Sequence, residues 1–225
     1  DRSIDSVEWA GSSSQLLISF DDFGKRKLAA VDMEGNLRPL VSDVGSAGIS
    51  RPYTSGNFTV SDNGAYAYTA GSPNRPADVA VGHEDSAIRL TDLNADLLDH
   101  KTLGEVREIS WRSSVGDHDI YGWLVTPPGF DEAQEYPLLL EIHGGPFTAY
   151  GPHFSTEVQL YAAAGYVVLY TNPRGSTSYG YEFANEIHHN YPSQDYDDLM
   201  SGVDAVINMG FIDEEQLFVT GGSGG

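Results

Sequence analysis

One pentapeptide constrains the fold of this chain more than any other stretch. Gly221-Gly222-Ser223-Gly224-Gly225 fits the pattern Gly-x-Ser-x-Gly and directly follows the apolar run Leu217-Phe218-Val219-Thr220. Where this pattern is functional, a buried strand ends in a sharp turn that holds the serine hydroxyl above a sheet, and a helix follows. Glycine suits both flanks because the turn is strained and other backbone passes close by. The alternative is a glycine-rich turn or linker with a chance serine, so the surrounding pattern has to decide.

The stretch before the pentapeptide alternates between apolar strands and helices. The runs 137–142 and 166–171 are almost entirely apolar, which is typical of strands covered on both faces. The stretch 193–209 has apolar side chains at steps of three and four, which predicts a helix with one buried face. This order predicts an α/β fold, the α/β-hydrolase domain, with Ser223 as its nucleophile. The expected elements are strands 137–142, 166–171 and 217–221 and helices 155–164, 181–188 and 193–209.

The expected helices carry recognisable ends. Ser155 is available as an N-cap, and Gly165 and Gly210 follow the last turns of two helices. Three carboxylates lie in the first turn of the helix over 193–209, where the helix dipole favours negative charge. We interpret them as residues of the helix start and not as metal ligands; they are Asp195, Asp197 and Asp198.

A second motif supplies the other half of a hydrolytic site. His143-Gly144-Gly145-Pro146 directly follows the strand 137–142. In α/β-hydrolases a His-Gly-Gly loop at this place offers one backbone amide to the oxyanion, and the residue after the nucleophile offers the other. These donors would be the amides of Gly145 and Gly224, which would stabilise the negative charge as it develops on a substrate carbonyl. His143 itself is expected to have a structural role within its loop.

The first 104 residues have a different pattern, of short strands and turns without helices. Two groups of four short strands, separated by small turns, follow each other at an offset of roughly fifty residues, which suits four-stranded propeller blades. A β-sandwich or two unrelated sheets is the alternative. We assign 1–104 to the C-terminal blades of an incomplete β-propeller, with more blades expected before Asp1, and 105–225 to the N-terminal half of the hydrolase domain. The expected strands are 7–9, 15–20, 27–32, 37–41, 58–60, 65–68, 78–81 and 87–91.

Composition narrows the choice of partners. The formal net charge is −21, from 33 acidic and 12 basic residues. This balance argues against binding nucleic acid or an anionic membrane surface, because both require basic patches. The chain has no cysteine, which excludes a thiolate nucleophile and cysteine-bound metal. We expect no cofactor and no metal, and the compartment stays open between cytoplasmic and periplasmic or secreted.

Several motifs together resemble a known family. The blade-like repeats, His143-Gly144-Gly145-Pro146 and the serine pentapeptide are joined by three further motifs in between. In this order they resemble the prolyl oligopeptidase family of serine peptidases, and the His-Gly-Gly-Pro form is most similar to its acylaminoacyl-peptidase branch. The further motifs are Asn172-Pro173-Arg174-Gly175-Ser176, Tyr179-Gly180 and Asp195-Tyr196-Asp197-Asp198-Leu199.

The resemblance implies a β-propeller that covers the hydrolase domain, with the site in the cavity between them. It implies that the catalytic acid and base follow the serine in chain order, which places both after Gly225. Arg174 would shape the loop near the site. One departure stands out: many members carry an aromatic residue directly after the nucleophile, whereas this chain has Gly224, which removes an aromatic wall of the pocket.

These features predict a serine peptidase that hydrolyses short peptides through an acyl-enzyme, with the propeller restricting access. The same scaffold would also suit a serine esterase or an isopeptidase, and an inactive propeller-based binding protein is a third possibility. Without a general base a serine hydroxyl is a weak nucleophile, so the 225 residues alone are expected to be inactive. The oligomeric state stays open.

Overall fold

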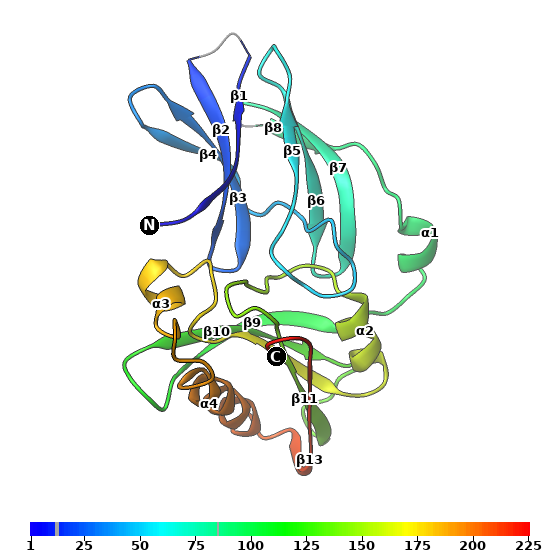
Figure 1. Ribbon diagram of the computed structural model, residues 1–225. Helices are drawn as coiled ribbons and strands as arrows, with labels where there is room; N and C mark the ends of the chain where they lie inside the picture. The colour runs from blue at the N-terminus through cyan, green and yellow to red at the C-terminus, as the bar shows by residue number, and fades with distance from the viewer. Residues whose placement is uncertain (12–13, 85) are drawn as a thin grey trace.

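Two small antiparallel sheets stand above a third, larger sheet (Figure 1). The computed structural model describes residues 1–11, 14–84 and 86–225. Each small sheet is a meander of four strands in which consecutive strands are neighbours, as the sequence predicts for propeller blades. The first comprises β1 (Ile4–Trp9), β2 (Gln15–Asp22), β3 (Lys25–Asp32) and β4 (Leu37–Val41), and the second β5 (Phe58–Val60), β6 (Tyr66–Ser72), β7 (Arg75–His83) and β8 (Ser86–Arg89).

The two meanders share one apolar cluster. Leu17 and Leu28 from the first sheet pack with Tyr66 from the second and with Val44 from the segment that joins them. A short helix, α1 (Ala95–Leu98), follows the second meander and was not expected from the sequence. The division of the chain into parts 1–104 and 105–225 stays a prediction.

The third sheet has five strands in the order β13-β11-β12-β10-β9. Its three strands β13, β11 and β12 run parallel, and β10 and β9 continue the sheet in antiparallel fashion. Parallel neighbours require crossovers, and helices supply them. The strands are β9 (Glu105–Arg112), β10 (Asp119–Thr126), β11 (Tyr136–Ile142), β12 (Val167–Asn172) and β13 (Ile212–Gly221), and the helices α2 (Thr156–Ala163), α3 (Tyr181–Asn185) and α4 (Asp195–Ile207).

Helices cover both faces of this sheet. Successive side chains of a strand point to opposite faces, and β10 shows the result: Leu124 packs in the cluster that holds Val203 of α4, whereas Val125 packs in the cluster that holds Val158 of α2. Every residue of β12 is buried, which confirms the prediction of a strand covered on both sides.

The ends of the helices follow the expected signals, with small shifts. Ser155 Oγ accepts a hydrogen bond from Val158 N at 3.1 Å, so Ser155 is the N-cap of α2 as predicted. The helix expected over 193–209 begins two residues later, because Ser193 N is held by Asp195 Oδ1 in a turn outside the helix. The helix expected over 181–188 is shorter and ends at Asn185.

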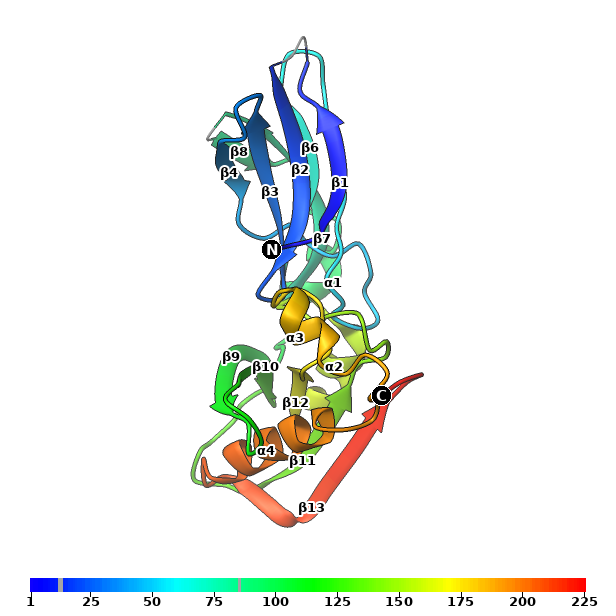
Figure 2. The same cartoon turned by 60° about the vertical axis from the view of Figure 1, so that its left-hand side comes forward.

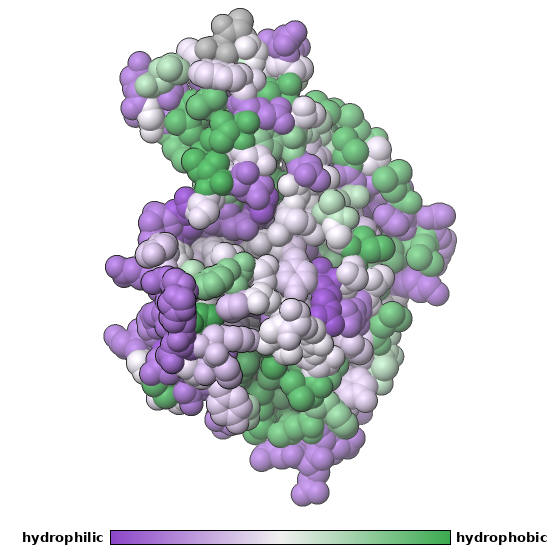
Figure 3. Space-filling view, viewed as in Figure 1, coloured by the Kyte–Doolittle hydropathy of each residue, from purple (hydrophilic) through white to green (hydrophobic). Residues whose placement is uncertain are grey.

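The strand that precedes the serine differs from the expectation. β13 begins at Ile212, five residues before the predicted start, since Ile212 already pairs with Tyr136 of β11. It lies at the margin of the sheet that these residues form (Figure 2), and Val219 is 67% exposed there. The burial of β13 in the full-length protein stays a prediction. An apolar patch covers this margin (Figure 3), formed with α4 and β11. Among the described residues, no helix is long and apolar enough to cross a membrane.

Candidate active site

Ser223 lies on a sharp turn directly after β13. Its φ is +60°, a conformation that residues other than glycine seldom adopt. The turn is closed by a hydrogen bond from Gly225 N to Gly222 O at 3.1 Å. A Cβ at Gly225 would lie 2.2 Å from Ile142 O, so this position has no room for a side chain. A nucleophile elbow is expected to have a serine in a strained conformation, followed by a position where the close backbone leaves room only for glycine. Ser223 and Gly225 meet both conditions.

The register of the sheet brings the second motif to the same place. β11 and β13 are parallel neighbours with Ile142 opposite Gly221, so the segments that follow them leave the sheet side by side. We call residues 143–146 the oxyanion loop and residues 221–225 the elbow. A Cβ at Gly144 would lie 3.2 Å from Ser223 Cβ, which places the serine side chain against the oxyanion loop.

The two predicted oxyanion donors lie on facing segments. A Cβ at Gly224 would lie 3.4 Å from Gly145 N. Within the described part of the chain, neither the amide of Gly145 nor that of Gly224 has a hydrogen-bond acceptor. Unpaired amides beside a strained serine are what an oxyanion hole requires before substrate arrives.

His143 is buried, and its hydrogen bonds argue against a role as general base. It is 5% exposed, its Nδ1 donates to Gly144 O at 2.7 Å, and its Nε2 contacts Ser176 Oγ at 2.9 Å. Burial lowers the pKa of His143, which favours the neutral ring. Both nitrogens are engaged with loop residues, in agreement with the structural role expected from the sequence.

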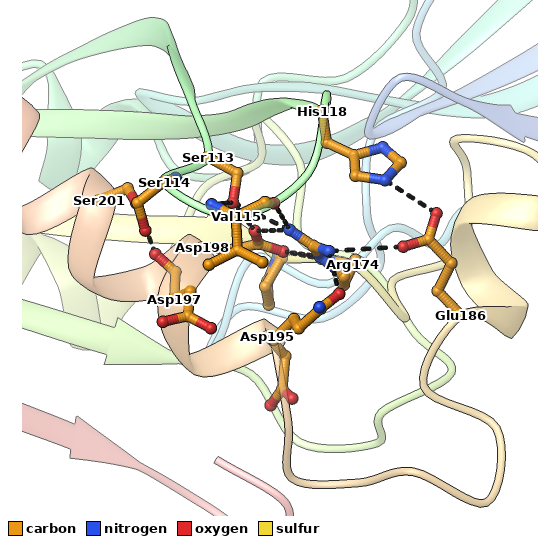
Figure 4. Close-up of polar contacts among 12 residues, drawn as sticks. Ser113, Ser114, Val115, His118, Arg174, Glu186, Asp195, Asp197, Asp198 and Ser201 are labelled. Atoms are coloured by element: carbon orange, nitrogen blue, oxygen red, sulfur yellow. Dashed lines mark hydrogen bonds and ion pairs between the residues drawn. The ribbon is translucent and has the colours of Figure 1, made fainter.

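Arg174 anchors the loop that carries Ser176, the partner of His143. Figure 4 shows the polar contacts around Arg174. Its backbone N and its Nε both donate to Asp198 Oδ2, at 2.8 and 2.9 Å, and its Nη2 donates to Asp198 Oδ1 at 2.7 Å. Both side chains are buried, and the hydrogen bonds to Asp198 raise the pKa of Arg174. Further bonds from the guanidinium reach Ser113 Oγ, Val115 O and Gln194 Oε1.

This network refines the sequence interpretation of α4. Asp195, Asp197 and Asp198 do lie in its first turn, but Asp198 is also the buried counter-ion of Arg174. Nothing in the spacing of residues 174 and 198 signals this pair. Among the residues described, no cluster of His, Asp or Glu could hold a metal ion.

A cavity of about 180 Å³ opens beside the elbow. Its lining includes Gly224, Pro146 and the ring of Tyr191. The Tyr191 hydroxyl donates to Gly224 O and lies 3.1 Å from the position of a Cβ on Gly224. The sequence indicated that Gly224 removes an aromatic wall, and the structure brings an aromatic ring to that place from the loop before α4.

Fold and site together define a class: an α/β-hydrolase domain preceded by β-propeller blades. Solved structures share the fold across the boundary between the two parts. The acylaminoacyl peptidase of Pyrococcus horikoshii matches 98% of this chain and 33% of its own, with a TM-score of 0.84 and 24% identity. The dipeptidyl peptidase 4 of Porphyromonas gingivalis matches 98% of this chain and 31% of its own, with a TM-score of 0.79 and 19% identity.

Sequence comparison points to the same family. Residues 152–225 match the sequence model of the prolyl oligopeptidase family. An uncharacterized peptidase of Bacillus subtilis, YuxL, is 33% identical over 221 residues, which cover 96% of this chain and 32% of that protein. A probable dipeptidyl-peptidase 5 of Aspergillus clavatus is 30% identical over 232 residues, covering 100% of this chain and 31% of its own. These findings confirm the resemblance to the prolyl oligopeptidase family, and the chain spans about a third of the length of these relatives.

Proposed function

We propose that this chain works in a serine peptidase that hydrolyses short peptides through an acyl-enzyme. The observation that carries the proposal is the elbow itself: Ser223, at a φ of +60°, lies against the oxyanion loop with the unpaired amides of Gly145 and Gly224 beside it. The relatives are a peptidase and a dipeptidyl-peptidase, which supports a peptide as substrate.

The roles of the residues follow from the chemistry of acyl transfer. Ser223 Oγ attacks the carbonyl carbon of the substrate and forms a C–O bond, while the hydroxyl proton passes to a general base. The oxygen that becomes negative lies between the amides of Gly145 and Gly224, and each such donor contributes on the order of 10²–10³ to kcat. When the C–N bond breaks, the base returns the proton to the leaving amine, and water repeats the sequence on the acyl-enzyme.

The general base is assigned to none of the residues above. His143 has both ring nitrogens engaged, which argues against this role. In the order typical of α/β-hydrolases the acid and then the base follow the serine along the chain. We therefore place both after Ser223.

The blades are proposed to restrict access. They stand above the edge of the third sheet from which the elbow and the oxyanion loop emerge (Figure 1). A substrate that reaches Ser223 has to pass beside them, which favours short or unfolded peptides over folded proteins.

Labelling of the full-length protein with a fluorophosphonate tests the proposal. Wild type is expected to label at Ser223, and Ser223→Ala is expected to stay unlabelled. Absence of label on folded wild type would remove the proposal. Rates on matched peptide amides and simple esters then separate a peptidase from an esterase, since hydrolysis of esters alone would favour the second.

A further inference from the structure

The segment between the two blades reaches the hydrolase sheet at the candidate site. We call residues 49–54, which lie between β4 and β5, the seam segment. Its backbone makes four hydrogen bonds of 2.7 to 3.2 Å, two with the loop after β11 and two with the first turn of α2. The pairs are Thr156 N to Ile49 O, Glu157 N to Ser50 O, Gly151 N to Pro52 O and Thr54 N to Ala149 O.

Tyr53 is the residue of this segment that touches the oxyanion loop. It forms a β-bridge with Tyr150, and the two rings have centroids 4.7 Å apart, which fixes both the backbone and the ring. Its hydroxyl oxygen accepts a hydrogen bond from Gly144 N at 3.0 Å. A residue 91 positions earlier in the chain therefore holds the amide next to the predicted oxyanion donor.

The same hydroxyl and the nucleophile approach one glycine. The position of a Cβ on Gly144 is 3.5 Å from Tyr53 Oη and 3.2 Å from Ser223 Cβ. Tyr53 and Ser223 thus flank one glycine of the oxyanion loop. A shift of this glycine would change the distance between nucleophile and oxyanion donor, and misplacement by about 1 Å costs on the order of 10² in rate.

The two contacts on Gly144 fix the direction of the Gly145 amide. A peptide unit is planar, and its C=O and N–H point in opposite directions. His143 Nδ1 holds the carbonyl of Gly144, which belongs to the same peptide unit as the N–H of Gly145. Tyr53 holds the preceding peptide unit through Gly144 N. With both units held, the N–H of Gly145 has one orientation before substrate binds.

Arg51 keeps the seam segment against the elbow. Its guanidinium pairs with Glu157 at 2.9 Å and with the buried Glu141 at 3.4 Å. These partners, first the hydrogen bond to Glu157, raise the pKa of Arg51, so it stays charged. A Cβ at Gly222 would lie 2.8 Å from Arg51 Nη1. From the blade side, Arg51 therefore reaches the elbow and Tyr53 reaches the oxyanion loop.

We propose that Tyr53 is a positioning residue of the oxyanion hole, supplied by the blade part of the molecule. It acts through Gly144 and not on the substrate, and it makes the geometry of the hole depend on the contact between the two parts. The inference rests on the proposed function, because it presupposes that the Gly145 amide binds the oxyanion.

The test compares two Tyr→Phe substitutions in the full-length protein. Tyr53→Phe removes the acceptor of Gly144 N and keeps the ring. Tyr161→Phe is the matched control, since Tyr161 of α2 bonds Glu157 Oε1 at 3.0 Å, the carboxylate that also pairs with Arg51 of the seam segment. Tyr161 also bonds Thr220 of β13, but it does not touch the oxyanion loop. Tyr53→Phe is expected to lower kcat about 10-fold or more with KM changed less than about 2-fold, because a displaced oxyanion donor weakens the transition state alone.

Two further measurements separate positioning from folding and from the proposed function. Each rate is divided by the concentration of active sites, measured by titration with a burst reagent. Loss of folded protein then does not count as loss of kcat. A peptide boronic acid, which places an oxygen in the hole, is expected to lose affinity in Tyr53→Phe by the factor lost in kcat/KM. Unchanged kcat and boronate affinity in Tyr53→Phe, with wild type labelled at Ser223, would overturn the inference. Wild type that does not label would instead overturn the proposed function.

Discussion

The two halves of the candidate site are held in different ways. The oxyanion loop is supported from the interior, where His143 is buried against Ser176, and from the blade side, where Tyr53 holds Gly144. The elbow follows β13, whose partner strand in the described part of the chain is β11, and Ser223 itself is exposed there. Tyr191 donates to Gly224 O, and Arg51 approaches Gly222. The oxyanion loop is thus held by side chains from the interior and from the blade side, whereas the elbow is held by the end of β13 with Arg51 and Tyr191 beside it.

This difference indicates where each half is vulnerable. The unpaired amides of the oxyanion hole have to be oriented before substrate arrives, so their loop needs rigid support. The serine needs exposure to reach a carbonyl, and it has a φ of +60° in a turn closed by the hydrogen bond from Gly225 N to Gly222 O. Substitutions on the loop side should therefore act on orientation and stability, and substitutions at the elbow on chemistry.

The largest expected effect compares two serines, the nucleophile on the elbow and a residue that supports the oxyanion loop. In the full-length protein, Ser223→Ala is expected to lower kcat by about 10⁶-fold, since the nucleophile is lost. Ser176→Ala, which removes a contact of His143, is expected to lower it by about 10-fold, since only loop orientation changes. Steady-state kinetics on one peptide substrate measures both. Equal losses would contradict the division of roles.

The next effect concerns the anchor behind the oxyanion loop. Arg174→Met leaves the Asp198 carboxylate buried without its cation and is expected to lower the free energy of unfolding by about 3–5 kcal/mol. Adding Asp198→Leu removes the stranded charge and is expected to recover most of this loss. Urea unfolding of the wild type and of the single and double variants gives the comparison. A double variant no more stable than the single one would show that packing, and not charge, anchors this loop.

A smaller effect is the pH dependence contributed by His153, which lies between the oxyanion loop and α2. Burial lowers its pKa to about 4; Asp21 opposes this shift and Arg26 adds to it. The unfolded chain binds this proton below about pH 6.5 and the folded chain only below about 4, so stability rises with pH across this window, by about 3 kcal/mol in total.

The measurement is the difference in free energy of unfolding between wild type and His153→Asn from pH 7 to 4. A difference is needed because Asp43, whose pKa burial raises to about 7, contributes a slope of opposite sign. The gap between the two proteins is expected to shift in favour of His153→Asn as the pH falls. A gap independent of pH would mean that His153 binds its proton as easily in the folded protein as in the unfolded chain.

The smallest effect concerns the pocket wall on the elbow side. Tyr191→Ala is expected to change the preference between large and small side chains on the acyl side of the cleaved bond, by about 10-fold in relative kcat/KM. Tyr191→Phe keeps the ring and serves as the control, with its preference close to wild type. A preference unchanged in Tyr191→Ala would show that this ring does not contact the acyl side chain.

Local patterns predicted much of the fold. The eight short strands of the blades, the strands β11 and β12 and the N-cap at Ser155 were visible because alternation, apolar runs and capping residues are local signals. The start of β13 was not, because the stretch after Ile212 is acidic and joins the sheet by pairing with β11.

The candidate site divides in the same way. Ser223, Gly145 and Gly224 were predicted from two short sequence motifs, and the parallel register of β11 and β13 brings these motifs together. Their roles stay predictions until activity is measured. The family resemblance named Arg174 as shaping the loop near the site, but its pairing with Asp198, 24 positions away, was not predicted. Tyr53, which meets Gly144 across 91 positions, was not predicted at all. Such pairs have no periodicity, so only the folded chain shows them.

The seam segment also completes a helix that belongs to the other part. The first amides of an α-helix have no partner within it, and those of Thr156 and Glu157 in α2 are met by the carbonyls of Ile49 and Ser50. In a hydrolase domain expressed from residue 105 onward, the seam segment would be missing. These two amides would then be exposed to water, and the first turn of α2 would fray. Hydrogen–deuterium exchange at those two amides would therefore report whether the blades and the hydrolase domain are engaged or apart.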